Sequence, residues 1–169
     1  MGYICTSAVT WASVRLLLII SKLNNLESKS IDFVLAFPQA DLDVPVYMEL
    51  PMGMSPEDDI NRRKYVLRLN KSLYGLKQAG HNWFEKLKAG LIDRDFVQSQ
   101  VDKCVFYRQD CIILTYVDDC IIVGKDMQIV DSLIESLTVG HEKFLLTDEG
   151  SIDKYLEYLS KISMTPRLR

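Results

Sequence analysis

The chain has none of the long apolar runs that mark a membrane protein. Its most apolar stretch, VRLLLII at residues 14–20, is far too short to cross a bilayer and contains Arg15. The stretch also lies too late, behind too weak a basic region, for a secretory signal peptide. We therefore expect it to lie in the hydrophobic core, and we expect no membrane partner.

Cysteine is scarce and shows no metal-binding spacing. The four cysteines form no CxxC pair and no Cys/His zinc pattern. This argues against a zinc module and predicts reduced, mostly buried thiols in an intracellular protein. The four are Cys5, Cys104, Cys111 and Cys120.

A surplus of basic residues is also missing. The chain has 20 Lys and Arg against 23 Asp and Glu, a formal net charge of −3. Proteins that bind nucleic acid usually carry a basic surplus, at least locally, so composition alone does not indicate such a partner. No repeat, low-complexity tract or Gly/Ser linker divides the 169 residues, and 48% of them are hydrophobic. We expect one domain with a substantial core.

Apolar periodicity and β-branched runs predict a mixture of helices and strands. The helix nearest the start places Trp11, Leu17 and other apolar residues at helical spacing, and a later helix puts Trp83, Leu87 and Leu91 on one face. We interpret Trp83 and its neighbour Phe84 as core residues; base-stacking platforms are the alternative. This order of elements predicts an α+β domain, a sheet with helices packed on one face. The predicted elements are a helix over 7–23, strands over 30–37, 44–50 and 64–70, a helix over 81–91, three strands within 103–124, a helix over 126–137 with Asp126 as N-cap, and a strand or helix within 144–163.

Two adjacent aspartates stand between the apolar runs IILTYV and CIIV. Asp118 and Asp119 would lie at the tip or edge of a packed hairpin, where a two-residue turn favours Asn-Gly or Asp-Gly over Asp-Asp. Two carboxylates this close repel, which raises one pKa or requires a cation. Mg²⁺ suits such a pair because it takes oxygen ligands and keeps positions for substrate phosphates. A solvated acidic turn is the alternative.

A metal site of this kind needs a further carboxylate, and Asp32 is the outstanding candidate. It lies inside the apolar run SIDFVLAF, where an ionised side chain is costly to bury unless it is paired. A strand-edge aspartate that faces water is the other interpretation. Three aspartates on neighbouring strands could hold two metal ions for in-line phosphoryl chemistry.

Three segments in this order resemble one known family. IDFVLAFPQADLDVPVYMELP, RLNKSLYGLKQAGHNWFEKL and YVDDCIIVGKD look like the reverse transcriptase, an RNA-directed DNA polymerase, of copia-type LTR retrotransposons. The pairing of SLYGLKQAG with a later YVDD is highly specific, and the resemblance runs from about residue 7 to about residue 158. It implies a polymerase palm over about 26–158, residual fingers over about 1–25, and no thumb, within a single partial domain over 1–169.

The resemblance also implies roles for individual residues. Asp32, Asp118 and Asp119 would be the catalytic metal ligands for two Mg²⁺ (or Mn²⁺) ions. Phe37 would exclude a 2′-hydroxyl and so favour deoxynucleotides, although plain core packing is the alternative. Tyr116 would lie near the primer terminus.

Further positions match the family's loop before the second palm helix. Gln78 and Gly80 would approach the nucleotide and template, with glycine allowing close approach of the backbone. Lys71 and Lys77 are the basic groups best placed for phosphate contact, and surface solubility explains them nearly as well. Lys154 is a possible counterpart of a lysine that the family carries near its C-terminus.

The implied activity is nucleotidyl transfer from a deoxynucleoside triphosphate to the 3′-hydroxyl of a primer on an RNA or DNA template. The implied partners are the primer–template and the rest of a Pol polyprotein, with integrase and RNase H. The implied location is a cytoplasmic particle or the nucleus. Because the fingers segment, thumb and RNase H are expected to be missing, duplex affinity should be weak. A truncated remnant that folds without polymerising is the alternative, and a two-metal nuclease on an unrelated fold is a third class.

Overall fold

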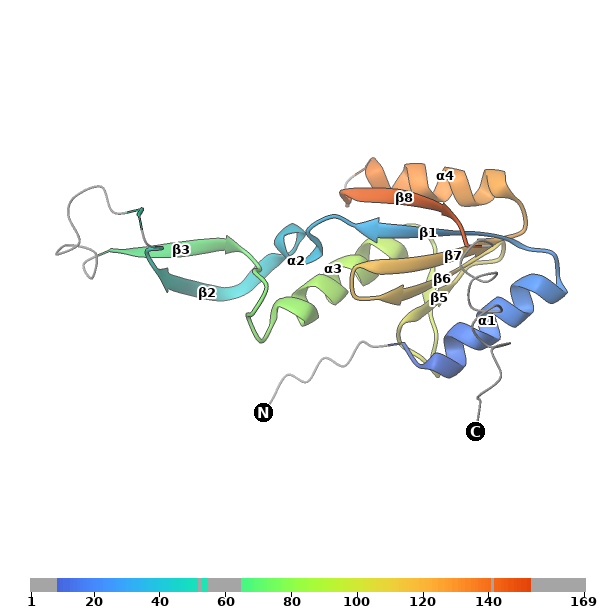
Figure 1. The fold of residues 1–169 in the computed structure, drawn as a ribbon, viewed down its shortest axis with the longest axis horizontal. Coiled ribbons are helices and arrows are strands. Elements are labelled where there is room, and N and C mark those ends of the chain that lie inside the picture. Colours follow the sequence, from blue (N-terminus) through green and yellow to red (C-terminus); the bar gives the residue numbers. More distant parts are fainter. Residues whose placement is uncertain (1–8, 52, 55–64, 141, 153–169) are drawn as a thin grey trace, which may run out of the picture.

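The computed structural model describes residues 9–51, 53–54, 65–140 and 142–152. Figure 1 shows the elements along the chain. The predicted order of helices and strands is confirmed, with α2 and β4 in addition. The elements are α1 (Trp11–Leu23), β1 (Glu27–Phe33), α2 (Ala36–Gln39), β2 (Asp41–Glu49), β3 (Val66–Lys71), α3 (Ala79–Ile92), β4 (Val97–Gln98), β5 (Val105–Tyr107), β6 (Cys111–Tyr116), β7 (Asp119–Gly124), α4 (Met127–Thr138) and β8 (Leu146–Ser151).

Six strands form one antiparallel sheet in the order β4-β5-β6-β7-β1-β8. The strand β1 therefore lies between β7 and β8, although all of β2 to β6 separate it from β7 in the chain. The hairpin of β2 and β3 is a separate two-stranded ribbon that extends away from the sheet (Figure 1). Two distant segments, β1 and β7, thus become direct neighbours.

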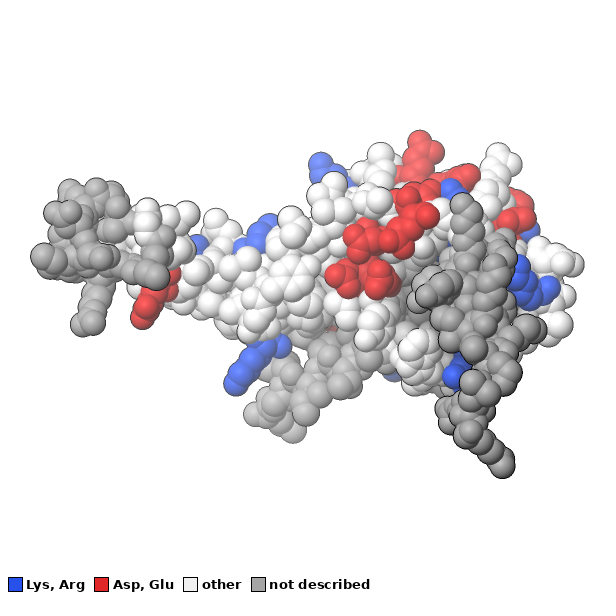
Figure 2. Space-filling view, in the orientation of Figure 1, with Lys and Arg blue, Asp and Glu red and all other residues white. Residues whose placement is uncertain are grey.

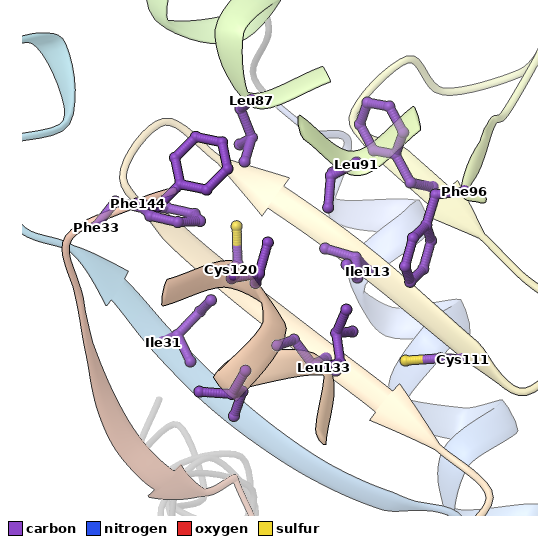
Figure 3. Packing of buried hydrophobic residues seen from close by; sticks show 14 of the residues in the cluster. Ile31, Phe33, Leu87, Leu91, Phe96, Cys111, Ile113, Cys120, Leu133 and Phe144 are labelled. Atoms are coloured by element: carbon purple, nitrogen blue, oxygen red, sulfur yellow. The ribbon is translucent and has the colours of Figure 1, made fainter. Parts of the chain in front are cut away.

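The main core lies between one face of the sheet and the helices α3 and α4 (Figure 3). Alternate residues of the strands point into it, among them Ile31, Ile113 and Ile122, as the period-2 geometry of a strand requires. The predicted inward face of α3 is confirmed: its members Trp83, Leu87 and Leu91 are all buried.

The opposite face of the sheet carries α1, so the prediction of helices on one face only was wrong. Leu17 of α1 packs against Leu114 and Val123, which alternate with the residues that face the main core. Because only one stripe of α1 meets the sheet, Leu16 is exposed, and so is Trp11, which is 76% exposed. The apolar run at residues 14–20 is thus only partly a core segment.

The strand predicted over 30–37 ends early, at Phe33. Leu35 has a left-handed backbone with φ of 51°, and the chain then enters the short helix α2. The Gln39 side chain fixes this turn, since its amide nitrogen donates to the carbonyl oxygens of Val34 and Leu145 at 2.8 Å each. The turn leaves Asp32 as the next-to-last residue of a strand that ends beside the β6–β7 turn.

Other sequence predictions are confirmed within the described residues. Asp126 caps α4 and accepts a hydrogen bond from the backbone N–H of Ile129 at 2.9 Å. Three cysteines are buried and form no disulfide, namely Cys104, Cys111 and Cys120. The ambiguous tail contains a strand, β8, whereas Cys5 and the tail beyond residue 152 lie outside the described residues. No helix in the described part of the chain is both long and apolar enough to span a membrane.

Candidate active site

The turn between β6 and β7 differs from the sequence prediction in its central residues. Tyr116 pairs with Asp119, so the two-residue loop consists of Val117 and Asp118, and Asp119 opens β7. Val117 has φ of 59°, a conformation that β-branched residues rarely adopt. Such strain persists only where surrounding contacts hold it, and it gathers at functional sites.

Two hydrogen bonds hold the backbone of this turn. The indole Nε1 of Trp83, on α3, donates to the carbonyl oxygen of Val117 at 2.6 Å. The backbone N–H of Phe33 donates to the carbonyl oxygen of Asp118 at 2.8 Å. The turn is therefore tied both to the helix behind the sheet and to the neighbouring strand.

Asp32 lies directly opposite Asp119 in the register of β1 and β7. Opposed residues of an antiparallel pair project from the same face, with Cβ atoms about 5 Å apart. Because β8 pairs with the other side of β1, Asp32 also lies opposite Thr147 and does not belong to an edge strand. With Asp118 in the adjoining turn, the structure gathers all three predicted carboxylates at one end of the sheet.

Figure 2 shows acidic side chains over the end of the sheet where β1, β7 and β8 lie in Figure 1. Sequence reasoning missed Glu149 of β8, whose charge acts on Asp32 and Asp119 and which comes from the tail whose structure the pattern left open. Its carboxylate accepts a hydrogen bond from the hydroxyl of Ser30 at 2.8 Å. Ser30 and Asp32 are alternate residues of β1 and so share a face.

Burial and mutual repulsion raise the pKa values of Asp32 and Asp119. Burial raises the pKa of Asp119, and the charges of Asp118, Asp32 and Glu149 raise it further. Burial also raises the pKa of Asp32, followed by the charges of Asp118 and Glu149. Each shift means that the cluster disfavours its own ionised form unless positive charge is supplied.

The donor set fits a hard divalent cation, because every candidate ligand is a carboxylate oxygen. Within the described ranges, no three His, Cys, Asp or Glu side chains form a group that could hold an ion by themselves. Magnesium is nevertheless usually bound by one or two carboxylates with waters and substrate phosphates, rather than by a complete protein cage. The arrangement therefore suits a cation that arrives with a phosphate ligand.

Phe37 lies on α2, half-buried, with its ring 4.6 Å from the ring of Tyr74 and tilted by 38°. Tyr74 belongs to SLYGLKQAG but was not singled out from the sequence. Burial raises the pKa of its phenol, and the charges of Asp118 and Asp32 raise it further. The pair Phe37–Tyr74 thus borders the acidic cluster.

The other predicted site residues lie around the start of α3. Gln78 is the residue before α3, and Gly80 is in its first turn, where a Cβ would meet nothing within 4 Å. No internal contact therefore requires glycine at position 80. Lys77 is exposed in the preceding turn, whereas Lys71 at the end of β3 forms an ion pair with Asp41. Tyr116 is 49% exposed beside the aspartates.

A family model described as reverse transcriptase (RNA-dependent DNA polymerase) matches residues 3–162. The chain belongs to this family. The resemblance noted from the sequence motifs is thereby confirmed, and the similar proteins are copia-type Pol polyproteins of transposons. No solved structure matches this reverse transcriptase chain.

Three relatives illustrate the similarity of this reverse transcriptase segment. It is 32% identical over 158 residues to the retrovirus-related Pol polyprotein from transposon TNT 1-94 of Nicotiana tabacum, covering 90% of this chain and 11% of that protein. It is 32% identical over 148 residues to the Pol polyprotein from transposon RE1 of Arabidopsis thaliana, covering 85% and 10%. It is 31% identical over 136 residues to the transposon Ty1-NL2 Gag-Pol polyprotein of Saccharomyces cerevisiae, covering 80% and 7%. The chain thus spans about a tenth of the length of these relatives.

Proposed function

We propose that this chain is the palm of an RNA-directed DNA polymerase, which transfers a nucleotide from a deoxynucleoside triphosphate to a primer 3′-hydroxyl. One observation carries the proposal: Asp32 and Asp119 are opposed across β1 and β7, with Asp118 in the adjoining turn. In this reading the six-stranded sheet with α3 and α4 is the palm. The sequence resemblance implies a palm over all of about 26–158 and fingers only over about 1–25, whereas we now assign the separate ribbon of β2 and β3 to the fingers as well.

The three aspartates would hold the divalent cations, two Mg²⁺ or Mn²⁺ ions. When bound, these ions lower the pKa of an attacking hydroxyl and offset the charge on the transferred phosphate. The chain's own contribution is to hold the carboxylates close together at one end of a rigid sheet, where a cation would offset their repulsion. Their raised pKa values support this role, because a site that repels itself binds a cation readily.

The aromatic pair Phe37–Tyr74 would face the sugar of the incoming nucleotide. Phe37 would exclude a 2′-hydroxyl, and Tyr74 would keep its ring in place; the ring contact at 4.6 Å supports this assignment. Tyr116, next to the turn, would contact the end of the primer.

The start of α3 would approach the nucleotide and template strand. The open space in front of Gly80 supports this role, because a bare backbone permits close approach. Gln78 would offer its amide to the substrate there. Lys77 would contact phosphate, and Lys71 would do so only by exchanging its partner Asp41.

The partners in this proposal are an RNA or DNA primer–template, a deoxynucleoside triphosphate and the remainder of a Pol polyprotein. The relatives support the last of these, because they are named Pol or Gag-Pol polyproteins. Contacts from other parts of such a polyprotein would add the basic surface that the net charge of −3 does not provide.

Primer extension tests the proposal. The chain is incubated with a homopolymer RNA template, a DNA primer and the matching deoxynucleotide, with Mg²⁺ or Mn²⁺. We expect cation-dependent extension that Asp118→Ala abolishes; extension that survives this substitution would refute the catalytic assignment. Cation binding that depends on the aspartates without any extension would instead favour a folded remnant that does not polymerise.

A further inference from the structure

Trp83 occupies an unusual place for a core residue. Its ring is only 2% exposed, in the aromatic group that it forms with Phe33 and Phe144. Its Nε1 donates to the carbonyl oxygen of Val117, 34 residues away in the turn between β6 and β7, at 2.6 Å. Apolar packing alone does not require this bond, because phenylalanine or leucine could fill a purely apolar site.

The bond ends on the most strained residue of the site. Val117 has φ of 59°, which is unfavourable for a β-branched side chain. The chain could relax this residue by rotating about the N–Cα bond of Val117, which would also move the peptide that carries the Val117 carbonyl. A donor fixed in the core opposes that rotation, and the peptide in question connects Val117 to Asp118.

The same indole also contacts the strand that carries Asp32. The rings of Trp83 and Phe33 meet edge to face, with centroids 5.1 Å apart and planes at 67°. Phe33 directly follows Asp32, and its backbone N–H donates to the carbonyl oxygen of Asp118. The Trp83 side chain therefore contacts both chain segments that carry the carboxylates, through the Phe33 ring on one and the Val117 carbonyl on the other.

We propose that Trp83 is a positioning residue, whose indole N–H holds the Val117 carbonyl and so fixes Asp118 and Asp119 relative to Asp32. Its effect on the backbone follows from the geometry alone. Its effect on turnover rests on the proposed polymerase function.

The test removes the N–H and keeps the shape. Replacement of Trp83 by benzothienylalanine puts sulfur in place of the indole nitrogen and leaves the ring system otherwise similar. The matched control is the same replacement at Trp11, the other tryptophan of the chain, which is 76% exposed on α1. Trp83→Phe is a second variant made from natural residues.

The first readout needs neither cation nor substrate. Amide hydrogen exchange at Phe33 reports its bond to the Asp118 carbonyl, and we expect about tenfold faster exchange in the Trp83 variants. Amides of β5 and β6 away from the turn should keep their rates, as should every amide in the Trp11 control. Unchanged exchange at Phe33, or equal acceleration throughout the sheet, would overturn the proposal.

The second readout is a double-mutant cycle with Val117→Gly. Glycine adopts positive φ without strain, so the turn should then need the indole bond less. We expect loss of the N–H to accelerate Phe33 exchange about tenfold with valine at position 117 and less than about threefold with glycine. Equal effects in both backgrounds would show that the indole bond does not act by holding the strained conformation of Val117, and would overturn that step of the proposal.

Turnover separates this inference from the proposed function. If the wild-type chain extends primers, kcat should fall about tenfold in the Trp83 variants while KM for the primer–template stays the same; an unchanged kcat would overturn the catalytic part. If the wild type extends no primer but Phe33 exchange responds as expected, the polymerase proposal fails and the positioning of the carboxylates stands.

Discussion

Removal of one carboxylate from the acidic cluster should make the protein more stable and inactive. The variant is Asp119→Asn, which keeps the side-chain shape and deletes a charge directly opposite Asp32. Two unit charges about 5 Å apart repel by about 0.8 kcal/mol in water, and more where the surroundings are less polar. With Asp118 as a second neighbour, we expect a gain of about 1–2 kcal/mol at low salt and less at high salt.

Thermal unfolding followed by circular dichroism measures this gain. For a chain of this size, 1 kcal/mol corresponds to about 2–4 °C in Tm. With a chelator present at pH 7, the variant should therefore melt about 2–8 °C above the wild type. With millimolar Mn²⁺ the difference in Tm between variant and wild type should become smaller or change sign, because only the wild type gains the stabilisation that comes from cation binding.

The dependence on pH has a defined sign. The folded state raises the pKa of Asp119, so in the range between its unfolded and folded values the native protein binds more protons than the unfolded chain. Wild-type stability should thus rise relative to the variant as pH falls from 7 through the raised pKa. Glu135→Gln, on the exposed face of α4, removes a charge elsewhere and serves as the control. A variant that melts at or below the wild type without cation would refute the repulsion argument.

Three further outcomes follow from contacts elsewhere in the molecule. Gly90→Ala should lower the free energy of unfolding in urea by about 1–3 kcal/mol, because its Cβ would lie 2.6 Å from the Phe144 ring. Gly80→Ala, whose Cβ would meet nothing within 4 Å, should not lower it, and equal stabilities of the two variants would contradict this packing. Burial raises the pKa of Asp102, but hydrogen bonds from Ser13, Cys104 and Thr10 lower this pKa below its usual range. The stabilisation of α1 by ionised Asp102 should therefore be present above about pH 4 and be lost as pH falls through the lowered pKa. Asp102→Asn should accordingly lose about 2 kcal/mol at pH 7 in urea unfolding, and the difference from the wild type should shrink steadily as pH falls below about 4. A difference that stays constant as pH falls would count against this role. Tyr74→Ala should lower discrimination against ribonucleotides up to about tenfold in single-nucleotide incorporation, while Tyr74→Phe retains it; loss in both variants would assign the effect to the hydroxyl instead of the ring.

Local patterns in the sequence were sufficient to predict most elements. Helical spacing located α3 and its buried face, and Asp126 marked the start of α4 through a capping bond that acts over three residues. The order of elements and the acidic candidates also came from the sequence, because catalytic chemistry restricts residue types more than packing does.

Features that depend on partners distant in the chain were not predictable in the same way. The early end of β1 depends on Gln39, whose amide binds a carbonyl 106 residues away at Leu145. The exposure of Trp11 depends on which stripe of α1 meets the sheet, and apolar spacing in that helix fits more than one stripe. The contact of Tyr74 with Phe37 depends on the short helix α2, which the sequence did not predict.

The composition of the turn shows the same limit. Asp-Asp is a poor pair for a two-residue turn. The register instead puts Val117 and Asp118 in the loop, which is a still less favourable pair because a β-branched residue rarely adopts positive φ. The conformation is held by Trp83 and Phe33, both outside the hairpin. Local rules therefore failed where surrounding structure imposes strain, as is common at functional sites.

Binding of Mn²⁺, followed by electron paramagnetic resonance with and without a deoxynucleoside triphosphate, shows whether Asp32 and Asp119 form a cation site. We predict that the wild-type chain binds two ions when nucleotide is present, and that Asp32→Asn and Asp119→Asn each lose this binding. Glu135→Gln should bind as the wild type does. If Asp32→Asn also bound two ions with wild-type affinity, the opposed carboxylates of β1 and β7 would not be the cation site.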